Sequence, residues 1–159
     1  MSADGLRIGQ GYDVHPFSDD EGRVLVLGGV TFTGHCGLVG HSDADVVAHA
    51  CTDAILGASG SGDIGTLFPD SDPSLSGADS IDLLRRAHHR VRAAGWRVAN
   101  IDCTVVLDSP KLAPRRAEME AALSDAVGAP VTVKGKRTEG MAGLAGGIHC
   151  HAVALLVAE

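Results

Sequence analysis

The chain has 159 residues, of which 45% are hydrophobic but only 3% aromatic, and its formal charge is −7 at pH 7. This length suits a single domain over residues 1–159 with a core of Ala, Val, Leu and Ile. The negative charge argues against a nucleic-acid partner, which normally binds a basic surface. The sequence also has no apolar run of membrane-spanning length and no signal-peptide pattern, so we expect no membrane partner and a cytoplasmic location.

The first predicted element is a strand over Leu6–Val14, at whose end the sequence reads Gly-Tyr-Asp-Val-His. Asp13 and His15 are two residues apart, so the side-chain period of a strand puts both on one face. A carboxylate and an imidazole that project together make half of a divalent-metal site of the kind that suits zinc. The alternative is a hydrogen-bonded surface pair without a metal. A second strand is predicted over Arg23–Gly28, followed by a glycine-rich loop.

The next predicted element is an amphipathic helix over Ser42–Gly57, with Ser42 as N-cap and Asp45 as the acidic partner of a capping box. His49 and Asp53 are four residues apart and share a face of this helix. Asp53 can therefore accept the second N–H of the His49 imidazole, which would fix the tautomer of a metal ligand. The alternative is a half-buried histidine that only bonds its helix neighbour.

Together, Asp13, His15 and His49 would provide three metal ligands. Catalytic zinc sites have three protein ligands and an open fourth position, whereas structural sites are closed. The alternative class is a non-catalytic protein whose metal is closed by a fourth protein ligand, for which His35, Cys36 and His41 are the candidates.

The rest of the chain continues to mix helices and strands. We expect a polar loop over Gly60–Gly77, then a helix over Asp79–Ala94 and a strand over Arg97–Leu107. A third helix over Leu112–Val127 and two strands over Pro130–Lys136 and Ile148–Ala158 follow. Because the first two strands abut, the pattern favours an α+β fold: a two-layer sandwich whose mixed sheet has helices packed on one face. The last strand is apolar on both faces beyond its start, which indicates that further copies of the chain cover the outer face. A helix of the same chain is the alternative cover.

Several motifs follow one another in order: RIGQGYDVHPF, LVGHSDADVVAHACTDAILGA, GDIGTLFPDSDP, GADSIDLLRRA and a strand ending in SPKLAP. Together they resemble the 2-C-methyl-D-erythritol 2,4-cyclodiphosphate synthase family, from about Arg7 to Pro114 and again around Val133–Lys134 and Ala152–Val157. The resemblance implies a phosphorus–oxygen lyase of the non-mevalonate isoprenoid pathway. Its substrate, 4-diphosphocytidyl-2-C-methyl-D-erythritol 2-phosphate, cyclises to 2-C-methyl-D-erythritol 2,4-cyclodiphosphate and releases CMP. It also implies a homotrimer with active sites at subunit interfaces.

The same resemblance assigns roles to individual residues. Asp13, His15 and His49 become ligands of one Zn²⁺ per subunit, and Glu139 a ligand of Mg²⁺ (or Mn²⁺) that binds with the substrate. His41 matches a residue that stabilises the transition state. The residues matched to substrate contacts are Asp13, His15, His41, Ser42, Asp63, Ile64, Gly65, Phe68, Asp70, Asp72, Leu107, Pro110, Lys111, Leu112, Ala113, Lys136, Arg137, Thr138 and Glu139. Among them, the resemblance assigns His41 and Ser42 to a substrate phosphate, the loop segments 63–65 and 68–72 to the methylerythritol unit, and the stretch 107–113 to the cytidine pocket. The alternatives are turn-forming roles for Asp63, Asp70 and Asp72, and plain surface charges for Lys111 and Glu139.

Two departures from the family pattern fall in the segment near Glu139. Arg137 stands where the family carries a catalytic threonine, so the resemblance leaves this role to Arg137 or to the neighbouring Thr138. The family's next stretch, Gly-Arg-Gly-Glu-Gly, is shortened here to Ala145-Gly146-Gly147. The alternative function on the same scaffold is a zinc-dependent phosphoesterase, which would use a metal-bound hydroxide on a phosphate ester.

Overall fold

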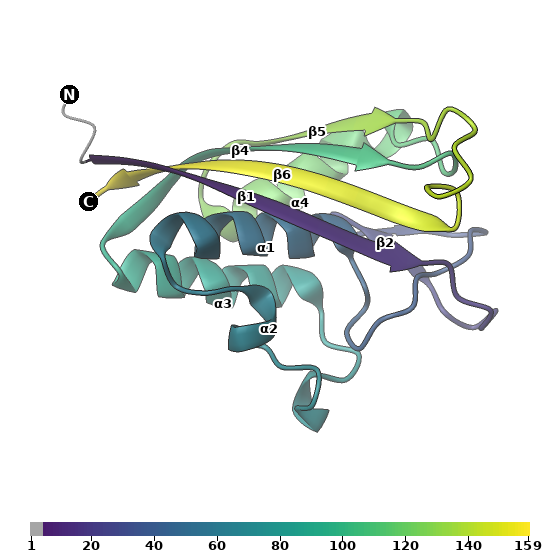
Figure 1. Ribbon diagram of the computed structural model, residues 1–159, viewed down its shortest axis with the longest axis horizontal. Coiled ribbons are helices and arrows are strands. Elements are labelled where there is room, and N and C mark those ends of the chain that lie inside the picture. The colour runs from purple at the N-terminus through teal and green to yellow at the C-terminus, as the bar shows by residue number, and fades with distance from the viewer. Residues whose placement is uncertain (1–4) are drawn as a thin grey trace.

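The computed structural model describes residues 5–159, which form a four-stranded sheet with helices on one face (Figure 1). The strands lie in the order β1-β6-β4-β5. Strand β6 runs antiparallel to both β1 and β4, whereas β4 and β5 are parallel, so the sheet is mixed as expected. These strands span Leu6–Pro16 (β1), Trp96–Val106 (β4), Val131–Lys136 (β5) and Gly147–Ala158 (β6).

Three long helices cover one face of the sheet. Helix α1 (Val46–Ser59) packs on β1 and β6, α3 (Ser80–Ala93) packs beside α1, and α4 (Arg116–Val127) packs on α3 and β5. The sheet and the α1–α3 pair form two layers (Figure 1). The α+β fold with helices on one side is therefore confirmed. Within residues 5–159, no helix is both long enough and apolar enough to span a membrane.

Two glycines bring α1 unusually close to β1. A Cβ atom at Gly9 would lie 2.0 Å from the carbonyl oxygen of Ala54, and one at Gly11 would lie 1.9 Å from that of Ala50. Both distances are far below van der Waals contact, so only glycine lets the helix backbone pack directly on this strand. The close approach matters for the site, because Asp13 lies two residues beyond Gly11 on the same face.

The start of α1 differs from the prediction. Its N-cap is Asp45, whose carboxylate accepts hydrogen bonds from Val47 N and Ala48 N, so the helix begins at Val46 and not near Ser42. The carboxylate of Asp45 also accepts from Gly28 N at 2.8 Å and Gly29 N at 2.6 Å. These glycines form the turn between two short strands, the second of which lies where the sequence predicted a glycine-rich loop. Asp45 thus joins the helix start to that turn, and Ser42 is free for another role.

The other differences are changes of boundary. The predicted strand over Arg23–Gly28 shortens to β2 (Leu25–Leu27), which pairs with β3 (Val30–Phe32) in a separate two-stranded ribbon. The expected stop at Gly57 is wrong, because α1 continues to Ser59 and is capped by Gly60, which has a left-handed φ of 71°. The predicted loop over Gly60–Gly77 contains a short helix α2 (Ile64–Leu67) and a 3₁₀ turn (Pro73–Leu75). The third helix begins later than predicted, at Arg116, after a further 3₁₀ turn.

The outer face of the sheet carries exposed apolar side chains on its first two strands. Ile8 is 74% exposed, and Tyr12, Val14 and Val153 are each between 43% and 48% exposed. Neighbouring residues on the inner face, such as Ala152, are fully buried under the helices. Within residues 5–159, no helix of the chain packs on this outer face, so the alternative cover considered from the sequence is absent there.

Candidate active site

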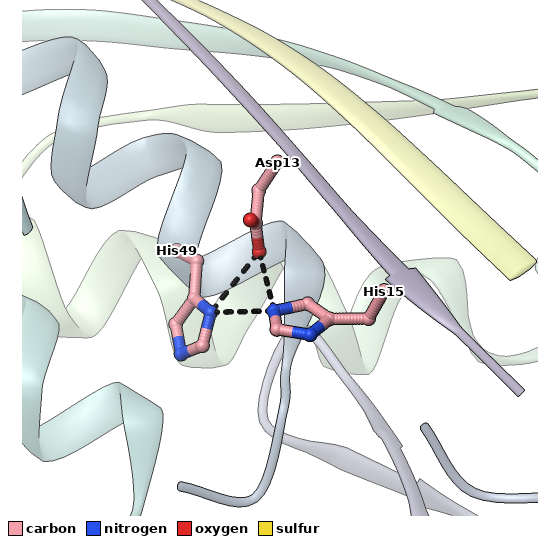
Figure 2. A group of neighbouring side chains, drawn as sticks. All are labelled: Asp13, His15 and His49. Atoms are coloured by element: carbon pink, nitrogen blue, oxygen red, sulfur yellow. Dashed lines mark hydrogen bonds and ion pairs between the residues drawn. The ribbon is translucent and has the colours of Figure 1, made fainter. Parts of the chain in front are cut away.

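Asp13, His15 and His49 converge at the end of β1, as the sequence spacing predicts (Figure 2). Asp13 Oδ2 lies 2.9 Å from His15 Nε2 and 3.0 Å from His49 Nδ1, and the two nitrogens are 3.3 Å apart. Asp13 and His15 come from the strand, whereas His49 comes from the first turn of α1. The close packing of this helix on the strand therefore assembles the cluster.

The outer nitrogen of His15 fixes the tautomer of its ring. His15 Nδ1 donates a hydrogen bond to the carbonyl oxygen of Val39 at 2.6 Å. A carbonyl oxygen can only accept, so the proton must be on Nδ1 when His15 is neutral. Its Nε2 then presents a lone pair to Asp13 and His49.

The outer nitrogen of His49 is fixed by serines and not by Asp53, which corrects the prediction. His49 Nε2 lies 2.9 Å from Ser80 Oγ and 3.1 Å from Ser42 Oγ. Ser80 Oγ donates its own proton to a carboxylate oxygen of Asp43, so it can only accept from His49. Asp53 instead accepts a hydrogen bond from Ile64 N at 2.7 Å, at the start of α2. The four-residue spacing placed Asp53 on the correct face but missed this competing donor.

These hydrogen bonds have a consequence for the centre of the cluster. Two imidazole lone pairs and one carboxylate oxygen face one another within 3.3 Å, and neither neutral imidazole has its proton on the inner side. Such an arrangement is repulsive unless a cation lies between the three atoms. Four ligands held tetrahedrally at about 2.0–2.1 Å from zinc are about 3.3 Å apart, close to the spacing found here. The three residues therefore fit a metal with an open fourth position.

The charges of the cluster agree with this geometry. Burial alone would raise the pKa of Asp13, but its close contacts with the His15 and His49 rings outweigh burial and hold the pKa below its ordinary value. Burial would lower the pKa of His15, but the hydrogen bond and charge of Asp13 raise it overall. Without a metal, a proton on the inner nitrogen of His15 therefore supplies the positive charge that Asp13 needs.

A cavity of about 480 Å³ opens beside the cluster. Its lining combines the three candidate ligands with loop residues that the sequence assigned to substrate. The lining residues are Asp13, His15, Gly40, His41, Ser42, His49, Ile64, Gly65, Phe68, Pro69, Asp70, Leu75 and Leu83. The structure thus brings the predicted phosphate side and the predicted methylerythritol side of the site into one space.

Two of the three aspartates in the loop over this cavity have local roles. Asp63 caps α2 by accepting from Thr66 N at 2.7 Å, and Asp72 accepts from Ser74 N at 2.9 Å. Neither lines the cavity, whereas Asp70 does. The backbone oxygen of Asp72 also lies 3.0 Å from His41 Nε2, which orients that ring at the cavity edge.

The predicted nucleotide-binding residues form a second, smaller pocket of about 270 Å³. It is lined by Leu107, Asp108, Pro110, Lys111, Leu112, Ala113, Arg116, Gly135, Lys136 and Arg137. Four of these side chains are basic, so the pocket suits an anionic ligand. None of its lining residues belongs to the first cavity. Within one chain, the two predicted parts of the substrate site are therefore separate.

The segment that departs from the family pattern lies at the edge of this second pocket. Arg137 lines the pocket, whereas Thr138 is only 2% exposed and does not. Thr138 Oγ1 donates to Asp108 Oδ2 at 2.6 Å, and its backbone N–H donates to Asp108 Oδ1 at 3.2 Å. Glu139 is exposed and has a positive φ of 54°, which is uncommon for a residue with a side chain. The threonine hydroxyl is thus already used, whereas the exposed Arg137 is a donor that lines the pocket.

The candidates for a fourth protein ligand do not join the cluster. His35 and Cys36 line a different cavity, between the loops around Asp20 and Gly34. Among residues 5–159, the only cluster of potential ligands found is Asp13, His15 and His49. Sequence reasoning missed the residues that hold these ligands in place, namely Val39, Asp43 and Ser80, because they are distant in the chain and carry no spacing signal.

Comparison with known proteins agrees with this site. Residues 6–157 match the YgbB family. A protein of Azoarcus sp. (strain BH72) named 2-C-methyl-D-erythritol 2,4-cyclodiphosphate synthase is 49% identical over 156 residues, covering 95% of this chain and 95% of that protein. The bifunctional enzyme IspD/IspF of Anaeromyxobacter sp. (strain Fw109-5) is 54% identical over 157 residues, which are 96% of this chain but 40% of that longer protein.

A solved structure gives the same result for the fold. A 2C-methyl-D-erythritol-2,4-cyclodiphosphate synthase in its CDP-bound form superposes with a TM-score of 0.85 and 40% sequence identity, covering 94% of this chain and 99% of that one. At this identity the agreement extends beyond the fold to the sequence that builds it. The chain therefore belongs to the YgbB family.

Proposed function

We propose that this chain converts 4-diphosphocytidyl-2-C-methyl-D-erythritol 2-phosphate into 2-C-methyl-D-erythritol 2,4-cyclodiphosphate and CMP. The observation that carries the proposal is the triangle of Asp13, His15 and His49, whose open side faces a cavity large enough for a phosphorylated sugar alcohol. The synthase that is 49% identical over nearly the whole chain supports the same reaction. The enzyme would act as a phosphorus–oxygen lyase of the non-mevalonate isoprenoid pathway, in the cytoplasm.

The triangle would hold Zn²⁺, and Glu139 would hold Mg²⁺ or Mn²⁺ together with the substrate. When bound, these cations would offset the negative charge of the reacting diphosphate. The chain itself has little covalent work in phosphoryl transfer, because positioning and charge neutralisation lower most of the barrier. His41 and Ser42 lie at the wall of the cavity, where the His41 ring would bind a phosphate oxygen in the transition state.

The loop over the cavity would bind the methylerythritol unit. Ile64, Gly65, Phe68 and Asp70 line this part of the cavity, and Asp63 and Asp72 shape the loop through their caps. The second pocket would bind the cytidine diphosphate end through Lys111, Lys136 and Arg137 and the backbone between Leu107 and Ala113. The CDP-bound structure of a relative supports a nucleotide in this family.

The active protein would be a homotrimer. Its two pockets share no lining residue, so one substrate can reach both only if the cavity of one subunit faces the second pocket of another. The exposed apolar side chains of the outer sheet face, such as Ile8 and Val153, would be buried in this assembly. Because each subunit would offer two different surfaces to its neighbours, the contact is of the head-to-tail kind that closes into a ring.

The test is to incubate the purified chain with the cytidine diphosphate substrate, Zn²⁺ and Mg²⁺, and to follow the products by phosphorus NMR. Equal amounts of CMP and a cyclic diphosphate, without inorganic phosphate, would support the proposal. Treatment with a zinc chelator should stop the reaction, and added Zn²⁺ should restore it. Release of inorganic phosphate would instead identify the zinc-dependent phosphoesterase.

A further inference from the structure

A series of hydrogen bonds runs from Asp43 through Ser80 to His49. It links the candidate metal ligands to the start of α3. We propose that Ser80 and Asp43 act together as positioning residues that hold His49 in the one tautomer able to bind a metal. This inference rests on the proposed metal site, but it concerns two residues that are neither candidate metal ligands nor residues matched to substrate contacts. We refer to the three residues as the Asp43–Ser80–His49 relay.

The direction of each hydrogen bond in the relay follows from the carboxylate at its end. Asp43 can only accept, and it accepts both the hydroxyl proton and the backbone N–H of Ser80, the latter at 3.1 Å. The single hydroxyl proton of Ser80 is therefore committed, and its oxygen accepts from His49 Nε2–H at 2.9 Å. His49 Nδ1 must then turn its lone pair toward Asp13 and His15. The carboxylate thus acts on the ligand through the serine.

The relay is rigid because Ser80 and His49 are buried and the half-buried Asp43 is held by several hydrogen bonds. Ser80 is 0% exposed and His49 is 8% exposed. Asp43 is held from a second side by Asp45 N, which donates to it at 3.1 Å. Its own N–H donates to the carbonyl oxygen of Ala78 at 3.1 Å. These bonds join the loop before α1 to the start of α3, so that two segments separated by more than thirty residues fix one ring.

Loss of the Ser80 hydroxyl would leave His49 with a weaker acceptor. Ser42 Oγ is also near His49 Nε2, at 3.1 Å, but it already accepts from Ala44 N and its own proton is not committed to a carboxylate. A Ser42 hydroxyl that donates to His49 Nε2 would favour the opposite tautomer, with a proton on Nδ1. That proton would occupy the position of the metal. Ser80 therefore selects the tautomer, and Ser42 alone does not.

The experiment compares metal affinity in the wild type with Ser80→Ala, Ser80→Thr and Asp43→Asn. Affinity for Co²⁺ and Zn²⁺ is measured by competition with a chromophoric chelator, and the visible spectrum of the Co²⁺ form reports the ligand geometry. Ser80→Ala should bind roughly 10–100-fold more weakly, as is typical when a hydrogen-bond partner of a ligating histidine is lost. Ser80→Thr keeps the hydroxyl and should recover most of the affinity. Asp43→Asn should fall between Ser80→Ala and the wild type.

A matched control separates positioning from stability. Ser59 is also a buried serine with hydrogen bonds, to Leu56 O and Ser61 Oγ, but it lies at the far end of α1. Ser59→Ala should leave metal affinity and the Co²⁺ spectrum unchanged, whatever its effect on melting temperature. If Ser80→Ala binds metal as tightly as the wild type, the relay has no positioning role and the inference is wrong. If the wild type itself binds neither ion, the metal site fails, and the inference fails with it.

Discussion

The two pockets of this chain are built in opposite ways. The cavity beside Asp13, His15 and His49 rests on a strand and a helix, and the rings of both histidines are oriented by hydrogen-bond partners, Val39 O for His15 and Ser80 Oγ for His49. The second pocket is built by the segments that follow β4 and end β5, and its charged side chains, Lys111 and Arg137 among them, are exposed. The first pocket is pre-organised for one small ion, whereas the second offers positive charge over a wider surface.

The difference indicates how the chemistry is divided. A cation bound in the first pocket must be held within a few tenths of an ångström, which requires rigid elements. A nucleoside diphosphate can be bound by several basic groups whose exact placement matters less. Because no lining residue is shared, each region can be damaged separately. Substitutions in the two regions should therefore give different combinations of metal loss and turnover loss.

The largest expected effect is that of His49→Ala. Removing one of three ligands leaves two, so the variant should lose its stoichiometric zinc and turnover should fall by at least about 10²–10³-fold, the order seen when a main electrostatic group is removed. Metal content by elemental analysis and CMP release measure the two effects. His89→Ala, an exposed histidine on α3, is the control and should change neither. A His49→Ala protein that keeps one zinc per chain would show that the ligand assignment is wrong.

Arg137→Ala should lower turnover about tenfold or more and leave the zinc content unchanged. Each factor of ten corresponds to about 1.4 kcal/mol in the activation free energy. The reason is that Arg137 lines the second pocket with a positively charged donor group that suits phosphate. Thr138→Val should have a smaller effect, because the Thr138 hydroxyl already donates to Asp108 and acts on the pocket only through the loop. Arg90→Ala, an exposed arginine of α3 that lines neither of the two pockets, is the control.

The result would be reversed if the threonine takes part directly. A larger loss in Thr138→Val than in Arg137→Ala at saturating substrate would mean that the loop rearranges when substrate binds, so that Asp108 releases the hydroxyl. Unchanged turnover in both variants would mean that this segment only attracts the anionic substrate.

Mixing the two damaged chains tests whether the regions cooperate between subunits. His49→Ala and Arg137→Ala should each be defective, but the proposed trimer, refolded from equal amounts of both, would contain interfaces where an intact metal cavity faces an intact second pocket. About a quarter of the sites should be intact if each site uses one region from each of two neighbours. Turnover should therefore recover to about a quarter of the wild-type value. No recovery, together with light scattering that reports a monomer, would show that both regions act within one chain.

The cluster of Asp13, His15 and His49 could be predicted from the sequence because local periodicity places these side chains together. Asp13 and His15 share a face in any strand, and a helix beginning near residue 45 presents His49 to that strand. The helix cap was misplaced for a physical reason. Ser42 and Asp45 are both good caps, and Asp45 is favoured only because Gly28 N and Gly29 N also need an acceptor. These hydrogen bonds join residues 16 and 17 positions apart, so the local sequence pattern cannot predict them.

The same limit explains the errors around the site. Asp53 was expected to orient His49 because the two share a helix face, but the backbone N–H of Ile64 competes for its carboxylate. Ser80 took that role from another helix. The residues of the second pocket were identified through the family resemblance and not from spacing, since Lys111 and Arg137 have no periodic relation. Asp108, which accepts hydrogen bonds from Thr138, was missed because the two residues are thirty positions apart and no local pattern links them.

The smallest expected effect is a change in how pH affects stability with and without metal. In the metal-free protein, the Asp13–His15 pair should stabilise the fold mainly between the ordinary pKa values of its members, 3.8 and 6.5. Because the pKa of Asp13 is lowered in the fold, it stabilises the protein above pH 3.8, and this stability is lost as pH falls through its folded pKa. Because the pKa of His15 is raised in the fold, it stabilises the protein below pH 6.5, and this stability is lost as pH rises through its folded pKa.

Bound zinc should reverse the loss of stability that the metal-free protein shows as pH rises above 6.5. The reason is that zinc takes the place of the proton on His15 Nε2. The melting temperature of the zinc-loaded protein minus that of the metal-free protein should therefore increase as pH rises from about 6 to 8. Each tenfold gain in affinity is about 1.4 kcal/mol, or roughly 3–6 °C for a domain of this size. The second pocket has no histidine among its lining residues within 5–159, so Arg137→Ala should show the same increase. A difference that stays constant over this range would mean that metal displaces no proton from His15, and that the cluster binds its cation in another way.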